Sequence, residues 1–396
     1  MIGMRAGITS RIRTNAGVYL HCVAAACIGV VAWRGTPTLI ALTAAIPVLV
    51  FLQESRFEAF SVGFAYYATA NWPLIPGVLG YFAPSGTILQ VLVFWAVPSL
   101  VLPLPWIVCW GPASSQALWR LPLAYFLSVV PPVGIIGWAS PLTAAGILFP
   151  GWSWAGLCVL VTISTLAVCR PIRAGLIAVS LAVIANSLYP GNPPPPESWE
   201  GVHTAFDRIT DPVDPLPEFR VAEGIQRIAL ASNSRVIVFP EFVVPQWTEA
   251  TEAFWRPTLA VVRSRGKTLL IGVGLPITGT SHYRNAMLAV GNAAASPFLQ
   301  RVPVPVVMWN PMKTERSVPL RLFGPGILEV AGERAAILVC YEQLLSWPIL
   351  QSAAQHPTLI VGVANDNWAR GTPIPAAQQA AVTAGRGSSG FRRSWR

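Results

Sequence analysis

Charged side chains are almost absent from the first half of this chain. Residues 1–190 contain 10 of its 44 Arg, Lys, Asp and Glu residues, and residues 59–119 contain none. The whole chain is 11% charged and 53% hydrophobic, with a mean hydropathy of +0.54, whereas soluble domains carry about 25% charged residues. This composition predicts an apolar, membrane-spanning helical half followed by a globular half.

Seven apolar segments follow one another in residues 1–190. They cover residues 17–33, 36–53, 57–72, 86–109, 118–138, 151–169 and 174–190. A helix needs roughly 20 apolar residues to cross a membrane, so the sequence predicts a membrane domain of about seven helices. Residues 140–150 form either a connector or a re-entrant segment. A cleavable signal peptide is the competing interpretation of the first segment, but its length and the segment directly after it favour an uncleaved helix.

The arginines predict how this domain is oriented. Positively charged loops favour the cytoplasm. With a cytoplasmic N-terminus, seven arginines fall on the cytoplasmic side, namely Arg5, Arg11, Arg13, Arg56, Arg120, Arg170 and Arg173, and Arg34 falls on the other. We therefore expect a multi-pass protein of a bacterial inner membrane with residues 191–396 in the periplasm. Residues 191–201 include four consecutive prolines, which predict a stiff linker.

The net charge of +10 does not indicate a nucleic-acid partner. Residues 1–190 contribute +6 and residues 385–396 contribute +4, so the globular body between them is neutral. Cys340 is the one cysteine of the globular half, and the sequence has no CxxC or Cys/His metal spacing. We expect neither a disulfide framework nor a metal or other cofactor.

The globular half alternates short apolar runs with amphipathic stretches, which is typical of a layered α/β fold. Strands are expected in "SRVIVFPEF", "KTLLIGVGLP", "YRNAMLAVG", "GILEVAGERAAILVCYE" and "TLIVGVAND", and helices in "WTEATEAFWRPTLAVVRSRG", "LLSWPILQSAAQHP" and "PAAQQAAVTA". Three expected strands end on polar residues, at Glu241, at Cys340 and at Asn365-Asp366-Asn367. Rigid sheets position reactive side chains at such ends, so these three strand ends mark a candidate site.

An inert buried thiol is the alternative for Cys340, because free cysteine is among the most buried residue types. The rarity of lysine in this chain favours the other interpretation, in which Cys340 belongs to an active site. The chain has 25 arginines but only two lysines, Lys267 and Lys313. A confined pocket that needs a compact ammonium group would resist replacement of lysine by arginine.

Three motifs together resemble the carbon–nitrogen hydrolase, or nitrilase, superfamily. They are "VIVFPEFVVP" with Glu241, "MWNPMKTE" with Lys313 and "LVCYEQLL" with Cys340. A helical membrane domain followed by such a domain looks like apolipoprotein N-acyltransferase. The closest overall resemblance is to plasmid conjugal-transfer proteins related to that enzyme. This implies a nitrilase-like αββα fold for residues 202–384.

The resemblance also implies roles for individual residues. Cys340 would attack an acyl carbon and form a thioester, Glu241 would accept its proton, and Lys313 would stabilise the oxyanion. Four neighbours would shape the pocket, namely Tyr341, Glu342, Asn365 and Trp368. For Tyr341 and Glu342, packing and a surface charge are the alternative. The implied partners are membrane lipid, a phospholipid acyl donor, an amine acceptor and the conjugation machinery.

Two features depart from the acyltransferase pattern. Arg321 lies where that family has a glutamate after the lysine, which places lipoprotein acylation in doubt. Residues 385–396, "GRGSSGFRRSWR", resemble either a frameshifted end, which would leave the α/β domain C-terminally truncated, or a basic tail. The expected function is a membrane-anchored thiol acyltransferase or amide hydrolase. The alternative is a non-catalytic assembly factor for conjugation or the envelope. A transporter is disfavoured, because residues 59–119 offer no charged group for an ion path.

Overall fold

The computed structural model describes residues 2–112, 114–191, 194, 196–204, 216–280, 282–310, 312, 317–389 and 393–395. The chain divides into two compact units. The helical unit contains Met1–Pro190, Leu344–Trp347 and Gly371–Gly390, and the α/β unit contains Gly191–Gln343, Pro348–Arg370 and Phe391–Arg396. The break at residue 190 coincides with the predicted end of the apolar half.

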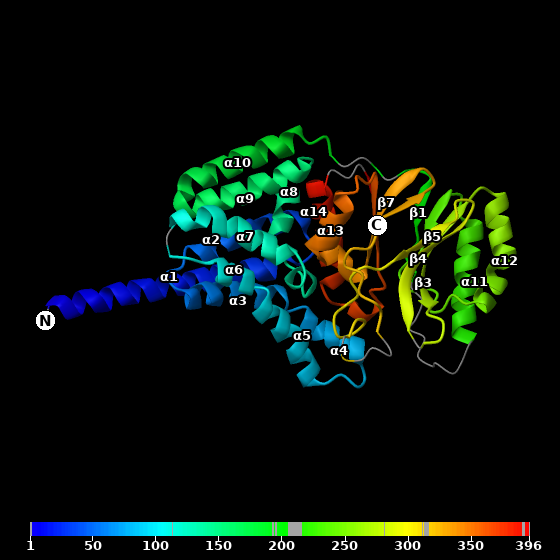
Figure 1. Ribbon diagram of the computed structural model, residues 1–396, viewed down its shortest axis with the longest axis horizontal. Helices are drawn as coiled ribbons and strands as arrows, with labels where there is room; N and C mark the ends of the chain where they lie inside the picture. The colour runs from blue at the N-terminus through cyan, green and yellow to red at the C-terminus, as the bar shows by residue number, and fades with distance from the viewer. Residues whose placement is uncertain are drawn as a thin grey trace. The chain divides into compact units, whose positions relative to one another are not determined.

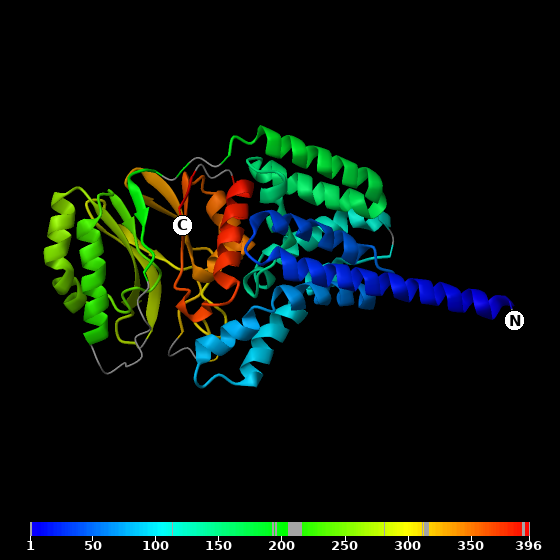
Figure 2. The same cartoon turned by 180° about the vertical axis from the view of Figure 1, so that it is seen from behind.

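The helical unit consists of helices joined by short turns. Its α-helices are α1 (Ile2–Ala32), α2 (Ala45–Phe51), α3 (Arg56–Ala70), α4 (Leu74–Phe82), α5 (Ile88–Val101), α6 (Leu104–Cys109), α7 (Ala117–Val129), α8 (Ala145–Leu148), α9 (Ser153–Cys169), α10 (Pro171–Leu188) and α14 (Ile374–Ser389). A capping box begins α3, because Ser55 and Glu58 satisfy each other's backbone N–H groups. Helices α9 and α10 pack side by side (Figures 1 and 2).

Among the described residues of this unit, two stretches are long and apolar enough to cross a membrane, Ile88–Cys109 and Pro171–Leu188. Residues Pro141–Leu148 and Ser153–Cys169 would add a third if this pair, bent by 119°, forms one span. The sequence predicted about seven. Proline, which lacks the N–H that a continuing helix needs, interrupts two of the predicted segments. Pro37 begins a 3₁₀ turn in the second apolar segment, and α7 ends at Val129, shortly before two prolines.

Helix α14 lies in the helical unit, although the sequence assigned residues 371–384 to the globular domain. Its last turns extend into the segment interpreted as a tail. The Gly151 nitrogen donates a hydrogen bond to the Gly387 carbonyl at 3.0 Å. A Cβ at Gly387 would lie 2.0 Å from the Gly146 carbonyl oxygen, so glycine permits this close approach. Truncation of the α/β domain and a frameshifted end remain predictions.

The α/β unit contains two sheets. The first has the order β1 (Trp199–Gly201), β2 (Val236–Val238), β3 (Thr268–Pro276), β4 (Tyr283–Gly291) and β5 (Ala295–Leu299), and the second has β6 (Ile327–Val330), β7 (Glu333–Val339), β8 (Leu359–Val363) and β9 (Arg393–Trp395). Strands β1, β2 and β3 are parallel, as are β7, β8 and β9, and the other neighbours are antiparallel. The helices of this region are α11 (Leu216–Ala231), α12 (Glu249–Ser264) and α13 (Ser346–Ala353).

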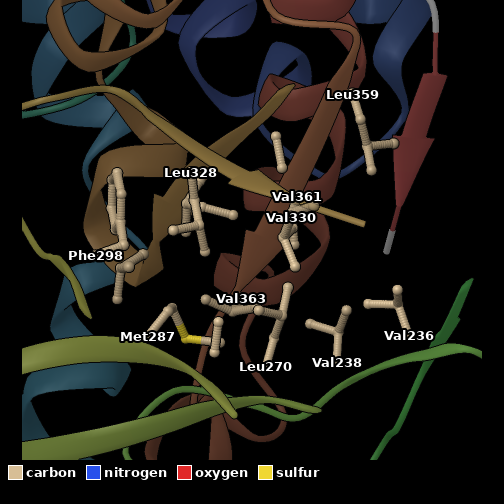
Figure 3. Packing of buried hydrophobic residues seen from close by; sticks show 14 of the residues in the cluster. Val236, Val238, Leu270, Met287, Phe298, Leu328, Val330, Leu359, Val361 and Val363 are labelled. Atoms are coloured by element: carbon tan, nitrogen blue, oxygen red, sulfur yellow. The ribbon is translucent and has the colours of Figure 1, made fainter. Parts of the chain in front are cut away.

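Apolar side chains hold the layers of this unit together. One core lies between the sheets and joins residues such as Val238, Leu270 and Met287 to Val361 and Val363 (Figure 3). Alternate residues of β2 and β3 belong instead to a second core, which they share with residues of α11 and α12. These two helices lie beside the first sheet (Figure 1). This alternation follows from the two-residue period of a strand. The layered α/β architecture predicted from the sequence is therefore confirmed.

Candidate active site at three strand ends

The turn after β2 carries Glu241 and runs along β3. Val244 N donates to Gly272 O at 3.1 Å, and Gly274 N donates to Val244 O at 3.1 Å. Gly272 is needed for this approach, because a Cβ there would lie 2.2 Å from Pro240 O and 2.6 Å from Glu241 Cα. The backbone of β3 therefore determines where the Glu241 carboxylate lies.

Cys340 follows the last residue of β7 and begins a 3₁₀ turn, Cys340–Leu344. Its φ is +49°, a left-handed conformation that is unfavourable for residues other than glycine. The side chain is buried, with 7% of its surface exposed. The Tyr341 backbone N–H donates to the Cys340 sulfur. The strained turn thus holds the thiol at one point beyond the strand.

The structure brings Glu241, Cys340 and Asn365 together. The Glu241 carboxylate accepts hydrogen bonds from the Cys340 thiol and, at 3.2 Å, from the Asn365 backbone nitrogen. The three expected strand ends therefore meet. Asn365 contributes its backbone N–H to this contact, whereas the sequence had suggested its side chain.

Burial shapes the protonation of this cluster. It raises the pKa of Glu241 to about 7, against the opposing effect of hydrogen bonds from Asn285, Cys340 and Asn365. Burial raises the pKa of Asp366 to about 6. The pKa of Cys340 is raised well above its ordinary value by burial, followed by the negative charges of Glu241 and Asp366. At neutral pH the thiol is therefore protonated beside a carboxyl group that can accept its proton.

Glu342 is fully buried and holds the nucleophile turn in place. Its Oε1 accepts hydrogen bonds from the backbone nitrogens of Arg301 at 2.6 Å and Val302 at 2.9 Å, and its Oε2 accepts from Val339 N at 3.1 Å. The Arg301 guanidinium, also fully buried, lies 3.6 Å from Glu342 Oε2. The surface charge considered as an alternative for Glu342 is therefore wrong, and its carboxylate is an internal anchor.

A second polar chain leads from Glu241 into the sheets. Asn285 Nδ2 donates to Glu241 Oε1 at 2.6 Å and to Gln300 Oε1 at 2.9 Å, and Gln300 Nε2 donates to Val339 O at 3.3 Å. Sequence reasoning missed Asn285, Gln300 and Arg301. A polar residue inside the apolar strand "YRNAMLAVG" was the available signal for Asn285, and nothing local marked the other two.

The remaining predicted residues have different placements. Lys313 lies outside the described residues. Tyr341 is buried, and burial raises its pKa above the ordinary value. Trp368 is partly buried in the 3₁₀ turn Asn367–Ala369 after β8. Arg321 is partly buried, and its backbone nitrogen donates to Arg301 O at 2.9 Å.

No cluster of three His, Cys, Asp or Glu side chains that could hold a metal ion occurs within the described ranges. The chemistry that this cluster can support is proton transfer from a thiol to a carboxylate, followed by nucleophilic attack of the sulfur.

No protein-family model matches the chain. Two solved structures to which the chain is similar are an amidase from Nesterenkonia sp. (17% identity, 43% of this chain, 69% of the amidase, TM-score 0.31) and a variant amidase of the nitrilase superfamily from Nesterenkonia AN1 (17%, 40%, 66%, TM-score 0.30). An apolipoprotein N-acyltransferase from Nitrosomonas europaea is 29% identical over 198 residues, which are 47% of this chain and 37% of that protein.

Two further proteins are similar over almost the whole chain. The conjugal transfer protein TraB of Agrobacterium fabrum is 31% identical over 373 residues, covering 90% of this chain and 87% of that protein. A probable conjugal transfer protein TraB of Sinorhizobium fredii is 30% identical over 365 residues, covering 91% and 92%. Since these similarities span both the helical and the α/β unit, the chain belongs to the family of conjugal transfer protein TraB.

Proposed function

We propose that the α/β unit is a thiol acyltransferase or amide hydrolase in which Cys340 carries the acyl group as a thioester. The observation that carries this proposal is the hydrogen bond between the Cys340 thiol and the buried Glu241 carboxylate. A protonated cysteine is a weak nucleophile unless a neighbouring base removes its proton. The buried carboxyl group with a pKa of about 7 suits that task near neutral pH.

In the first step, Cys340 Sγ bonds to the acyl carbon as its proton moves to Glu241. The carbonyl π electrons move to oxygen and form a tetrahedral oxyanion. The proposal assigns Lys313 and a backbone N–H near Cys340 to this oxyanion. When the intermediate collapses, the bond to the alcohol or amine leaving group breaks, and that group takes the proton from Glu241.

In the second step, an amine or water attacks the thioester carbon while Glu241 accepts its proton. Collapse breaks the carbon–sulfur bond, and the departing Cys340 sulfur takes the proton back. An amine acceptor makes the overall reaction acyl transfer, whereas water makes it hydrolysis. The same two residues and the same intermediate therefore serve both reactions.

We assign a phospholipid as acyl donor and an amine as acceptor. The helical unit contains the apolar stretches Ile88–Cys109 and Pro171–Leu188, which would anchor the protein in the bacterial inner membrane next to such a donor. The similarity to an apolipoprotein N-acyltransferase supports the same choice. The names of the similar TraB proteins support a role in conjugal transfer, with the α/β unit in the periplasm and the conjugation machinery as partner.

The proposal is tested by trapping the thioester. The full chain in membranes is incubated with a phospholipid that carries an alkyne-tagged acyl chain, and the tag is detected on the protein. We expect a label on Cys340 that neutral hydroxylamine removes, because hydroxylamine cleaves thioesters. Cys340→Ala and Glu241→Gln should both abolish it. Cys158→Ala, which removes an exposed cysteine of the helical unit, should leave it unchanged.

Absence of label on folded wild-type protein would overturn the acyltransfer proposal. The assembly-factor function would then take its place. In that case Cys340→Ala should transfer a conjugative plasmid as well as the wild type does, because no thioester would be needed. A label that persists in Cys340→Ala would place the chemistry at another residue.

A further inference from the structure

The amide of Asn285 can lie in one orientation only. Val339 O, a backbone carbonyl, only accepts hydrogen bonds, so the atom of Gln300 that faces it at 3.3 Å is Nε2. Gln300 therefore presents Oε1 to Asn285 at 2.9 Å. That oxygen in turn requires a donor, which makes the facing atom of Asn285 its Nδ2. The Val339 carbonyl beside Cys340 thus determines which atom donates and which accepts in Gln300, and through Gln300 in Asn285.

This orientation leaves the second N–H of Asn285 for Glu241. Nδ2 has two hydrogens, and the distance from Nδ2 to Glu241 Oε1 is 2.6 Å. Asn285 Oδ1 is buried and has no hydrogen-bond partner within the described part of the chain. Flipping the amide would exchange Nδ2 and Oδ1, and Oδ1 would then face the acceptor oxygens of Gln300 and Glu241. The two donor contacts of Nδ2, to Gln300 and to Glu241, therefore determine this orientation of the amide.

We propose that Asn285 and Gln300 are positioning residues that keep the Glu241 carboxylate oriented beside Cys340 and ionised. A hydrogen bond from a fixed donor stabilises the charged form of a carboxyl group more than the neutral form. Gln300 acts only through Asn285, because it does not contact Glu241. This inference rests on the proposed function, in which Glu241 removes the thiol proton.

The surroundings of Glu241 make such support necessary. Its side chain is 5% exposed. The described titratable groups that face it are Cys340 and Asp366, which are neutral or negative. The buried Arg301 guanidinium is paired with Glu342. Burial therefore favours the protonated acid, and among the hydrogen bonds that oppose this effect the one from Asn285 is the largest.

The test measures how fast iodoacetamide alkylates Cys340 in the full-length protein between pH 5 and pH 9, with the modified peptide quantified by mass spectrometry. Glu241 must be ionised to accept the thiol proton, so the wild-type rate should fall below about pH 7. Asn285→Leu keeps a side chain of similar shape but removes the two N–H donors of the amide. The acid limb of the rate profile, which is the pH range in which the alkylation rate falls, should move up by about one pH unit in this variant. At a pH below both limbs, Asn285→Leu should therefore react about tenfold more slowly than the wild type.

Gln300→Met should shift the limb in the same direction by less, because Asn285 keeps its contact but is no longer fixed. The double variant should match Asn285→Leu alone, since residues acting through one contact are not additive. Thr268→Val is the matched control. It removes a buried hydroxyl that accepts a hydrogen bond from the Ala293 backbone nitrogen at 3.0 Å. This variant should therefore be less stable than the wild type, but the acid limb of its alkylation rate should stay at the same pH.

An unchanged acid limb in folded Asn285→Leu would overturn the proposal, because Asn285 would then contribute to stability and not to the ionisation of Glu241. Additive shifts in the double variant would overturn the role given to Gln300. Infrared pH titration of the Glu241 carboxyl, assigned by subtraction of Glu241→Gln spectra, gives an independent readout. If wild-type Cys340 never reacts, the proposed function fails, and the infrared titration of Asn285→Leu still decides this inference.

Discussion

Glu342 Oε1 accepts the backbone N–H of Arg301 at 2.6 Å, while the Arg301 guanidinium lies 3.6 Å from Glu342 Oε2, and both side chains are completely buried. The pair joins the loop after β5 to the turn that carries Cys340. The carboxylate also accepts two further backbone N–H groups. Removing it would leave three backbone donors and one guanidinium without this partner.

Glu342→Ala should therefore destabilise the α/β unit by about 3–5 kcal/mol, which is the range for breaking a buried charge pair. Glu329→Ala provides the matched control, because Glu329 and Arg334 form an exposed pair at 3.2 Å. Its effect should stay within about 1 kcal/mol. Denaturant unfolding of both variants measures the difference. Equal effects would contradict the anchoring role of Glu342.

Gly272→Ala should impair the site through the backbone. The added Cβ would meet Pro240 O at 2.2 Å, so the turn carrying Glu241 must move away from β3. We expect Cys340 alkylation at pH 7 to fall at least about tenfold in protein that remains folded. Gly175→Ala, where a Cβ meets open space, is the control and should alkylate at the wild-type rate. Wild-type reactivity in Gly272→Ala would show that the position of this turn is unimportant.

Glu241 should make stability depend on pH. Its pKa is raised from 4.5 in an ordinary environment to about 7, so the folded protein binds this proton more tightly than the unfolded chain. The resulting stabilisation is complete below pH 4.5 and is lost as pH rises to about 7. Asp366, raised from 3.8 to about 6, acts in the same direction.

Glu241→Gln cannot ionise and should lose less stability between pH 5 and pH 8 than the wild type, by about 1–3 kcal/mol. Denaturant midpoints at the two pH values measure this difference, with Glu329→Gln as the exposed control. An identical pH dependence in wild type and Glu241→Gln would contradict the raised pKa. The same substitution should abolish thioester formation.

Lys313→Arg tests the proposed oxyanion group. A guanidinium keeps the positive charge but is larger and planar, so it should not fit a pocket that requires a compact ammonium. We expect thioester labelling to fall by about 100-fold or more. Lys267→Arg is the control, because Lys267 Nζ donates to the Ser232 carbonyl on another part of the unit. An active Lys313→Arg protein would contradict the confined pocket.

The arginine asymmetry predicts a cytoplasmic N-terminus and a periplasmic α/β unit. Alkaline phosphatase, which is active only in the periplasm, and a reporter that fluoresces only in the cytoplasm can each be fused after Asp207. We expect phosphatase activity and no fluorescence. The reverse result would mean that the number of membrane crossings before residue 191 is even.

The sequence by itself determined the apolar first half, the α/β pattern of the second half and the strand ends at which Glu241, Cys340 and Asn365 lie. These features are readable because each depends on local composition or on the two-residue and 3.6-residue periods of single segments. The strands β1, β5 and β9 and helix α11 were missed. The three strands are short, at three to five residues each, and β9 lies in the segment interpreted as a tail.

Only the tertiary structure decided what surrounds the thiol. Asn285 and Gln300 lie on or after strands of the first sheet, whereas Cys340 follows a strand of the second, so their contacts join residues far apart in the chain. No local period encodes such a network. Glu342 shows the same limit. Next to Cys340 in the sequence, its charge is compatible with a solvated turn, and its burial depends on whether Arg301 lies opposite it, which is a property of the folded unit.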